Sequence, residues 1–149
     1  MRTVAYNELE SIVGQEVGAS EWLEITQDRV NKFAEATGDF QWIHVDVERA
    51  TEAMGHPIAH GYLTLSLIPM LAAQVMNVDG VSRGINFGSN KVRFTNMVPV
   101  GSKVRLKQTC LKVEARAGGK QITMESVIEI EGKDRPACVA ETIGILYGE

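Results

Sequence analysis

The sequence predicts an α+β fold in which a curled antiparallel sheet wraps one long central helix. The first observation is the stretch of residues 61–76, which has no charged side chain and no polar face. A helix that is apolar all round must be surrounded by protein or lipid, and sixteen residues interrupted by Pro69 are too few to cross a bilayer. The second observation is the alternation of apolar and polar residues from about residue 81 onward, with glycine turns between the expected strands. Strands joined by hairpins form an antiparallel sheet, and such a sheet would surround the helix.

The composition indicates one globular domain over residues 1–149. Apolar residues make up 44% of the chain and charged residues 23%, which is the balance of a folded protein. No segment reaches about 18 uninterrupted apolar residues, and no basic stretch precedes an apolar run at the N-terminus, so we expect neither a membrane span nor a signal peptide. Cys110 and Cys138 lack CxxC spacing, so we interpret them as buried, reduced residues of a cytoplasmic protein.

The first sixty residues predict three short helices and a strand. The expected elements are a helix over residues 6–13, a strand over 17–25, and helices over 27–37 and 47–53. Thr26 is a typical N-cap residue, and Gly38 is the residue type that favours the position just past a helix end. The chain should therefore turn out of a helix directly before Asp39.

The expected strands follow one another through two turns, Gly118-Gly119 and residues 132–134. Residues at every second position are expected to face the helix, as in the series Ile122, Met124, Ser126, Ile128 and Ile130. One helix rarely covers both a sheet face and all of its edges. We therefore expect a homodimer formed by pairing of sheet edges.

The charge of the chain is divided between its two halves. Residues 1–80 carry 4 basic and 12 acidic side chains, whereas residues 81–149 carry 11 basic and 7 acidic ones. Glu114 is the only acidic residue within a basic strip, which consists of Arg83, Lys91, Arg93, Lys103, Arg105, Lys107, Lys112 and Arg116. The domain as a whole is acidic, so we expect no nucleic acid partner. The strip suits either a small phosphorylated ligand or a solvated strand surface.

Asp39 and His44 are the residues whose types and spacing suit acid–base chemistry. A carboxylate beside an imidazole can fix its tautomer, and the pair can hold a water molecule and exchange protons near neutral pH. The spacing alone is a weak signal, and an Asp capping a turn next to a structural His fits it equally. His56 and His60 lack further ligands for a metal, and Pro57 disfavours a helix that would bring them together, so we expect no metal site. We interpret His60 as a structural histidine near the start of the central helix.

Three segments, taken in order and spacing, resemble the MaoC-like (R)-specific enoyl-CoA hydratases. They are residues 33–50 (F-A-x-x-T-G-D-x-x-x-I-H-x5-A), residues 57–64 (P-I-A-H-G-Y-L-T) and residues 93–101 (R-F-x3-V-P-V-G). Gln41-Trp42 is similar to the NodN-like branch of that family. The resemblance covers nearly the whole chain.

This resemblance implies a hot-dog fold, a homodimer and a cytoplasmic enzyme that adds water to trans-2-enoyl-CoA to give (R)-3-hydroxyacyl-CoA. It implies no cofactor, because coenzyme A is part of the substrate. The catalytic Asp and His of the family fall on Asp39 and His44, its oxyanion-binding backbone N–H on Gly61, and an acyl-CoA contact on Phe94. It also implies that the uncharged helix lines an apolar acyl tunnel. Gln41-Trp42 departs from the usual Asn-Pro of the family, which leaves the loop and the pocket shape open.

Two other functions fit parts of the pattern. Hot-dog proteins also include acyl-CoA thioesterases, which commonly use a carboxylate on or beside the central helix, and residues 61–76 contain none. A non-catalytic acyl-CoA-binding protein would tolerate the loss of Asp39 or His44. A serine nucleophile is disfavoured because no GxSxG motif is present.

Overall fold

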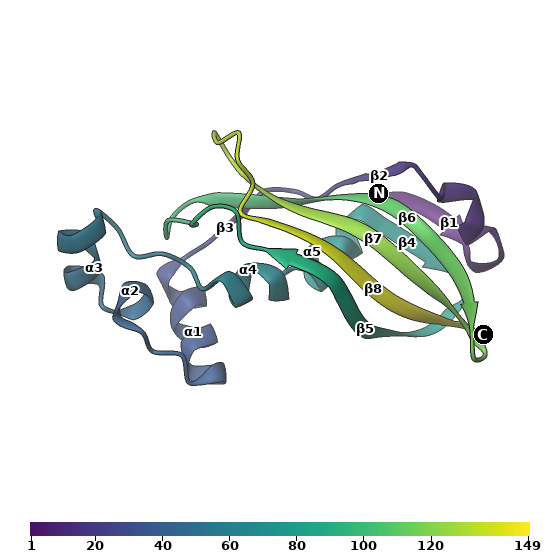
Figure 1. The fold of residues 1–149 in the computed structure, drawn as a ribbon, viewed down its shortest axis with the longest axis horizontal. Helices are drawn as coiled ribbons and strands as arrows, with labels where there is room; N and C mark the ends of the chain where they lie inside the picture. Colours follow the sequence, from purple (N-terminus) through teal and green to yellow (C-terminus); the bar gives the residue numbers. More distant parts are fainter.

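Two short helices lie end to end at the centre of the fold, in a computed structural model that describes residues 1–149. Helix α4 (Gly61–Ser66) and helix α5 (Ile68–Val75) meet at Leu67, which keeps right-handed helical angles of φ −77° and ψ −15°. The long helix expected over residues 61–76 is therefore broken once (Figure 1). Pro69 lies in the first turn of α5, where no backbone N–H needs a partner within the helix. In the middle of a continuous helix, the missing N–H of Pro69 would cost one backbone hydrogen bond.

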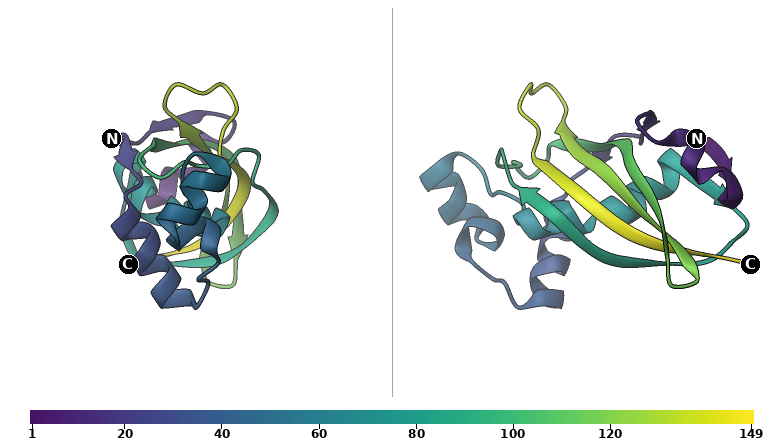
Figure 2. Two further views of the ribbon diagram at one scale, coloured as in Figure 1. Left: turned by 90° about the vertical axis from the view of Figure 1, so that its left-hand side faces the viewer. Right: turned by 45° about the vertical axis from the view of Figure 1, so that its right-hand side comes forward.

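An antiparallel sheet curls around these helices, as the alternating pattern predicted. Its strands run in the order β2-β6-β7-β8-β5, and β3 also pairs with β6. The strands are β2 (Glu16–Ala19), β3 (Leu23–Glu24), β5 (Val81–Arg93), β6 (Lys103–Arg116), β7 (Gly119–Ile130) and β8 (Cys138–Gly148). Figure 2 shows the sheet curving around the helices when the molecule is viewed from one end. Both predicted hairpin turns are present, between β6 and β7 and between β7 and β8.

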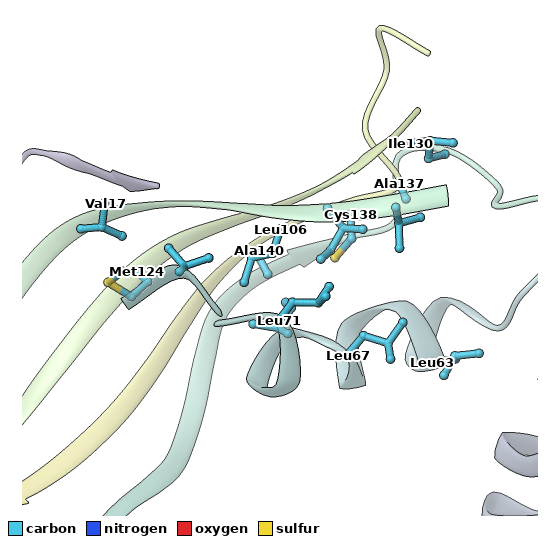
Figure 3. Close-up of a cluster of buried hydrophobic side chains, with 14 of the residues drawn as sticks. Val17, Leu63, Leu67, Leu71, Leu106, Met124, Ile130, Ala137, Cys138 and Ala140 are labelled. Atoms are coloured by element: carbon cyan, nitrogen blue, oxygen red, sulfur yellow. The ribbon is translucent and has the colours of Figure 1, made fainter. Parts of the chain in front are cut away.

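The core lies between one face of the helices and the concave face of the sheet. Leu63, Leu67 and Leu71 point from α4 and α5 toward the strands, where Leu106 and Cys138 meet them (Figure 3). On β7, the predicted inward series from Ile122 to Ile130 is buried throughout. Both cysteines are free and buried, as predicted.

The opposite face of the helices is not covered by this chain, although an uncharged helix was expected to be surrounded by protein. Tyr62 is 68% exposed and Met70 42% exposed on that face. Strand β5 is an edge strand that pairs only with β8. Ile85 and Phe87 of β5 are each about half exposed, at 48% and 49%. An uncharged helix face and a long unpaired strand edge thus lie open together.

The strand expected over residues 17–25 is instead two short strands, β2 and β3, which pair with the same neighbour β6. Between them, Ser20 continues the pairing with its side chain, because its Oγ accepts a hydrogen bond from Leu106 N–H at 2.9 Å. Before β2 the chain forms strand β1 (Arg2–Ala5) and the 3-10 helix η1 (Tyr6–Ile12), the latter close to the helix predicted over residues 6–13. Strand β1 pairs in parallel with β4 (Met76–Asp79).

Three small helices gather at the end of the molecule opposite the two termini (Figure 1). They are α1 (Gln27–Thr37), α2 (Trp42–Val45) and α3 (Val47–Met54). The Thr26 hydroxyl accepts a hydrogen bond from Arg29 N–H, and Gly38 has a left-handed φ of +80°, so both predicted helix ends are confirmed. Helix α2 was not predicted. No helix in the structure is long and apolar enough to span a bilayer.

Candidate functional site

The turn between α1 and α2 brings Asp39 and His44 together. Gly38 reverses the chain at the end of α1, and the Asp39 carboxylate then accepts a hydrogen bond from Gln41 N–H at 3.3 Å. Gln41 is the N-cap residue of α2, which carries His44, and the Gln41 carbonyl accepts from His44 N–H at 3.0 Å. A carboxylate oxygen of Asp39 and a ring nitrogen of His44 lie within 4.8 Å of each other.

Gln41 and Trp42, the pair that departs from the Asn-Pro of the family, form the start of α2. The Arg49 guanidinium of α3 lies 4.1 Å from the centroid of the Trp42 ring, which gives a cation–π contact between the two helices. This contact holds α2 against α3. The segment thus begins a short helix without a proline.

One ring nitrogen of His44 makes a hydrogen bond within the protein, and the other makes none. Its Nδ1 lies 2.6 Å from the Ile58 carbonyl oxygen, which can only accept, so Nδ1 carries the proton. The side chain is buried, and this desolvation lowers the pKa of His44 below the usual histidine value of 6.5. The neighbouring His60 also lowers this pKa, while the Ile58 hydrogen bond and the Asp39 charge oppose the shift. At neutral pH the ring is neutral and presents a lone pair at Nε2.

His60 joins the dyad in space, although sequence reasoning treated it as a separate structural residue. Its ring stacks on His44 with 3.9 Å between centroids and an interplanar angle of 25°. Its Nε2 donates to the Asp39 backbone carbonyl at 3.0 Å, which ties the α1–α2 turn to the start of α4. Phe33 covers another side of the ring at 4.8 Å. Its Nδ1 is buried without a hydrogen-bond partner.

The donor atoms of Asp39, His44 and His60 all lie within 4.8 Å of one another. Metal ligands must direct their lone pairs at a single point. The lone pairs of two nearly parallel stacked rings lie in separate planes instead. This geometry does not favour a metal ion, and the absence of a metal site stays a prediction.

A cavity of about 320 Å³ opens beside His44 and the start of α4. Its lining includes three residues singled out in the sequence, His44, Gly61 and Phe94, but not Asp39, which approaches His44 from the α1–α2 turn. Gly61 is the first residue of α4, and its N–H donates no hydrogen bond within the protein. The Phe94 ring lies so close that a Cβ atom on Gly61 would be 3.0 Å from it. Only glycine fits at this position without moving Phe94.

A larger cavity of about 690 Å³ runs along α4 and α5, between these helices and strands β5 to β8. Leu65, Ile68 and Ala72 line its helical wall. Met124 and Gly144 are among the residues that line its sheet wall. The uncharged helices therefore border a largely apolar space, as the sequence predicted.

The basic strip is mostly engaged within the protein. Three of its members pair with carboxylates, namely Arg105 with Glu129, Lys107 with Glu16 and Lys112 with Glu114. Arg83 and Arg116 stack on aromatic rings. Sequence reasoning missed Arg135, an exposed residue in the β7–β8 turn that lines the smaller cavity. Nothing in the sequence around Arg135 indicated this position, because it depends on how the curled sheet places the β7–β8 turn beside the cavity.

Comparison with known proteins gives consistent matches over most of the chain. A family model described as MaoC like domain matches residues 8–132. The chain is 51% identical to the 3-hydroxyacyl-thioester dehydratase Z of Mycobacterium tuberculosis, with 91% of each chain covered. It is 38% identical to nodulation protein N of Rhizobium meliloti, over 97% of this chain and 92% of that protein. The solved structure of an (R)-hydratase from A. caviae involved in PHA biosynthesis superposes with a TM-score of 0.72 at 26% identity, covering 89% of this chain and 94% of that one. The architecture is that of the hot-dog fold.

The lowered pKa of His44 predicts a loss of stability in mild acid. An unfolded histidine titrates near 6.5, so below that value the unfolded chain binds a proton that folded His44 does not take up. The free energy of unfolding should therefore fall as the pH drops from about 7.5 to about 5.5, and fall less in His44→Asn. Urea denaturation at both pH values measures this difference. Equal losses in the two proteins would contradict it.

Proposed function

The chain belongs to the MaoC-like dehydratase family and is a hydro-lyase, and we propose that it reversibly hydrates trans-2-enoyl-CoA to (R)-3-hydroxyacyl-CoA. The observation that carries this proposal is the meeting of Asp39, His44 and the free Gly61 N–H at one end of the molecule. The similar mycobacterial protein is named for 3-hydroxyacyl thioesters, and the similar solved structure is an (R)-hydratase. Thioesters of this kind are therefore the substrate class that we assign.

In the proposed reaction, Asp39 and His44 hold one water molecule between them. The Asp39 carboxylate and the bare Nε2 of neutral His44 both accept hydrogen bonds, so together they orient the water oxygen toward C3 of the substrate. One O–H bond of the water breaks as the O–C3 bond forms. The dyad takes this proton and returns a proton to C2, so that a water molecule is added in total and the dyad is restored.

Gly61 supplies the electrophilic half of the proposed site. As water attacks C3, negative charge moves onto the thioester carbonyl oxygen. A preorganised backbone N–H directed at that oxygen stabilises this charge, and losing such a donor typically costs about 10²–10³ in rate. Gly61 N–H is available for this role because nothing in the protein accepts its hydrogen bond. Phe94, packed on Gly61, would bound the space beside the thioester.

The proposed reaction requires proton transfer and charge stabilisation but no redox step, so it needs no cofactor. We also propose a cytoplasmic setting. Cys110 and Cys138 are unpaired, and burial raises the pKa of the Cys138 thiol to about 11, which keeps it protonated and unreactive. Free thiols of this kind are ordinary in a reducing compartment.

We propose a homodimer as the working form. The open face of α4–α5 and the unpaired edge of β5 are adjacent, and exposed edges of long strands are normally paired or covered in native proteins. A second copy would cover both by pairing β5 with its own counterpart, because a two-fold axis makes one surface complementary to itself.

The dyad predicts a large loss of activity in either of two conservative variants. Hydration of crotonyl-CoA, followed by the loss of its enone absorbance, should fall by at least about a hundredfold in Asp39→Asn and in His44→Asn. Asn keeps the turn at Asp39, because its side-chain oxygen still accepts from Gln41 N–H.

Asp46→Asn and His56→Asn are the matched controls, because Asp46 caps α3 and His56 lies outside the lining of the cavity. Both should keep near wild-type rates. Activity that survives in both Asp39→Asn and His44→Asn would show that these two residues are not the catalytic pair. Release of free CoA from saturated acyl-CoA, without hydration of enoyl-CoA, would instead favour a thioesterase.

The contact between Gly61 and Phe94 predicts a rescue. Gly61→Ala should lower kcat/KM for enoyl-CoA by about ten- to a hundredfold, because the new methyl group displaces the Phe94 ring and shifts the thioester. Phe94→Ala in the same chain should restore part of that loss by making room. If the double variant is no better than Gly61→Ala, the clash is not the cause.

The homodimer predicts a molar mass of twice 16.3 kDa by light scattering after size exclusion. Ile85→Lys should shift the protein toward monomer, because it places a charge on the exposed β5 edge. Val13→Lys is the control, since Val13 is also exposed, at 43%, but lies outside β5. A wild-type protein that elutes as a monomer would contradict the proposal.

A further inference from the structure

Gln108 is a polar side chain buried on the concave face of the sheet. It is 5% exposed and lies on β6 between Leu106 and Cys110, which face the same way and are fully buried. A buried amide is costly unless its polar atoms find partners. Gln108 also lines the larger cavity, so one side of its amide faces that space rather than the core.

A chain of hydrogen bonds runs from Gln108 across three strands. Gln108 Nε2 donates to Ser126 Oγ at 2.9 Å, and Ser126 Oγ lies 2.9 Å from Thr142 Oγ1. Thr142 Oγ1 in turn donates to the Met124 carbonyl at 3.5 Å. Because the Thr142 proton is donated to the Met124 carbonyl, the Ser126 hydroxyl is the donor in its bond to Thr142. The hydroxyl protons of the chain are therefore all used, and the Gln108 Oε1 atom accepts nothing from the protein.

Much of the remaining cavity wall is apolar or small. It includes Ile68 and Ala72 of α5, Met76 at the start of β4 and Gly144 of β8. Ser66, Asn86 and Ser89, which also line the cavity, are exposed. The cavity thus offers the Gln108 Oε1 acceptor, beside the second N–H of the same amide, in a largely apolar setting, where a hydrogen bond discriminates most strongly between ligands.

The position of Gln108 corresponds to the far part of an acyl chain. The lining residues Leu65 to Met76 begin about 6 Å and end about 22 Å from Gly61 along the helices, at about 1.5 Å per residue. Gln108 pairs with Gly18 of β2, and Gly18 packs against Val75, the last residue of α5. An acyl chain that extends along the helices from a thioester at Gly61 would therefore bring its distal carbons toward Gln108.

We propose that Gln108 makes this cavity selective for acyl thioesters that carry a hydroxyl group on a distal carbon, over plain alkyl chains of the same length. A hydroxyl can donate to Gln108 Oε1 as well as accept from the second Nε2 N–H, whereas a ketone oxygen can only accept and a methylene group does neither. The inference rests on the proposed function, because it takes Gly61 as the position of the thioester. The hydroxyl in question is far from C3, where the reaction itself places one.

Binding of saturated ligands tests this selectivity without relying on turnover. Titration calorimetry would compare hexadecanoyl-CoA, whose extended chain is about as long as the helices from Gly61 to Val75, with the same chain bearing a hydroxyl on its last or its last-but-one carbon. One of the two hydroxylated ligands should bind about three- to tenfold more tightly than hexadecanoyl-CoA, which corresponds to one net hydrogen bond. Gln108→Leu should abolish this preference. Gln121→Leu, on β7 but outside the cavity lining, should keep it.

Three results would overturn the proposal: no preference in the wild type, a preference that persists in Gln108→Leu, or a stronger preference for the matching ketone than for the alcohol. Gln108→Met, of similar length, serves as a second variant if Gln108→Leu does not fold, and should lose the preference equally. Hydration of crotonyl-CoA by the wild type is measured in parallel. Its absence would sink the proposed function but leave the binding ratio interpretable, because saturated chains are not hydrated.

Discussion

The hydrogen bond from His60 Nε2 to the Asp39 carbonyl is the interaction on which the geometry of the site depends. It joins the turn after α1 to the residue directly before Gly61, so the carboxylate and the free backbone N–H are fixed relative to each other. The same imidazole stacks on His44, so all three groups share one support. Fixed positions of these three groups matter for the proposed reaction, because acid–base and electrostatic catalysis both depend on preorganised groups.

Local signals predicted the elements whose ends are set by single residues. Thr26 and Gly38 marked α1 because capping depends on the side chain and backbone freedom of those residues alone. The hairpins followed from their turns and from the alternation along β7. The break at Leu67 and the open face of α4–α5 were missed, because an apolar pattern indicates that a surface needs covering but not which chain covers it.

The candidate site was predictable in part for the same reason. Asp39 and His44 are five residues apart, so a turn alone can bring them together, and the segment resemblance selected them. His60 lies sixteen residues beyond His44, and its stacking depends on how α4 docks against α1 and α2. Arg135 reaches the smaller cavity from the far hairpin. Gln108, by contrast, had a readable signal: a polar residue in the inward register of Leu106 and Cys110.

The larger cavity exists because β8 carries small side chains where the neighbouring strands carry large ones. Thr142 and Gly144 occupy successive inward positions in the cavity wall, whereas their partners on β7 are the larger Met124 and Ile122. Small residues at these positions forgo the apolar burial that larger ones would contribute, which is a cost in stability. The hydrogen bonds through Ser126 and Thr142 offset part of this cost and also leave one acceptor facing the space. The small side chains of β8 therefore reduce core packing but leave space for an acyl chain. The hydrogen bonds that join Gln108, Ser126 and Thr142 place a polar group beside the distal part of that space.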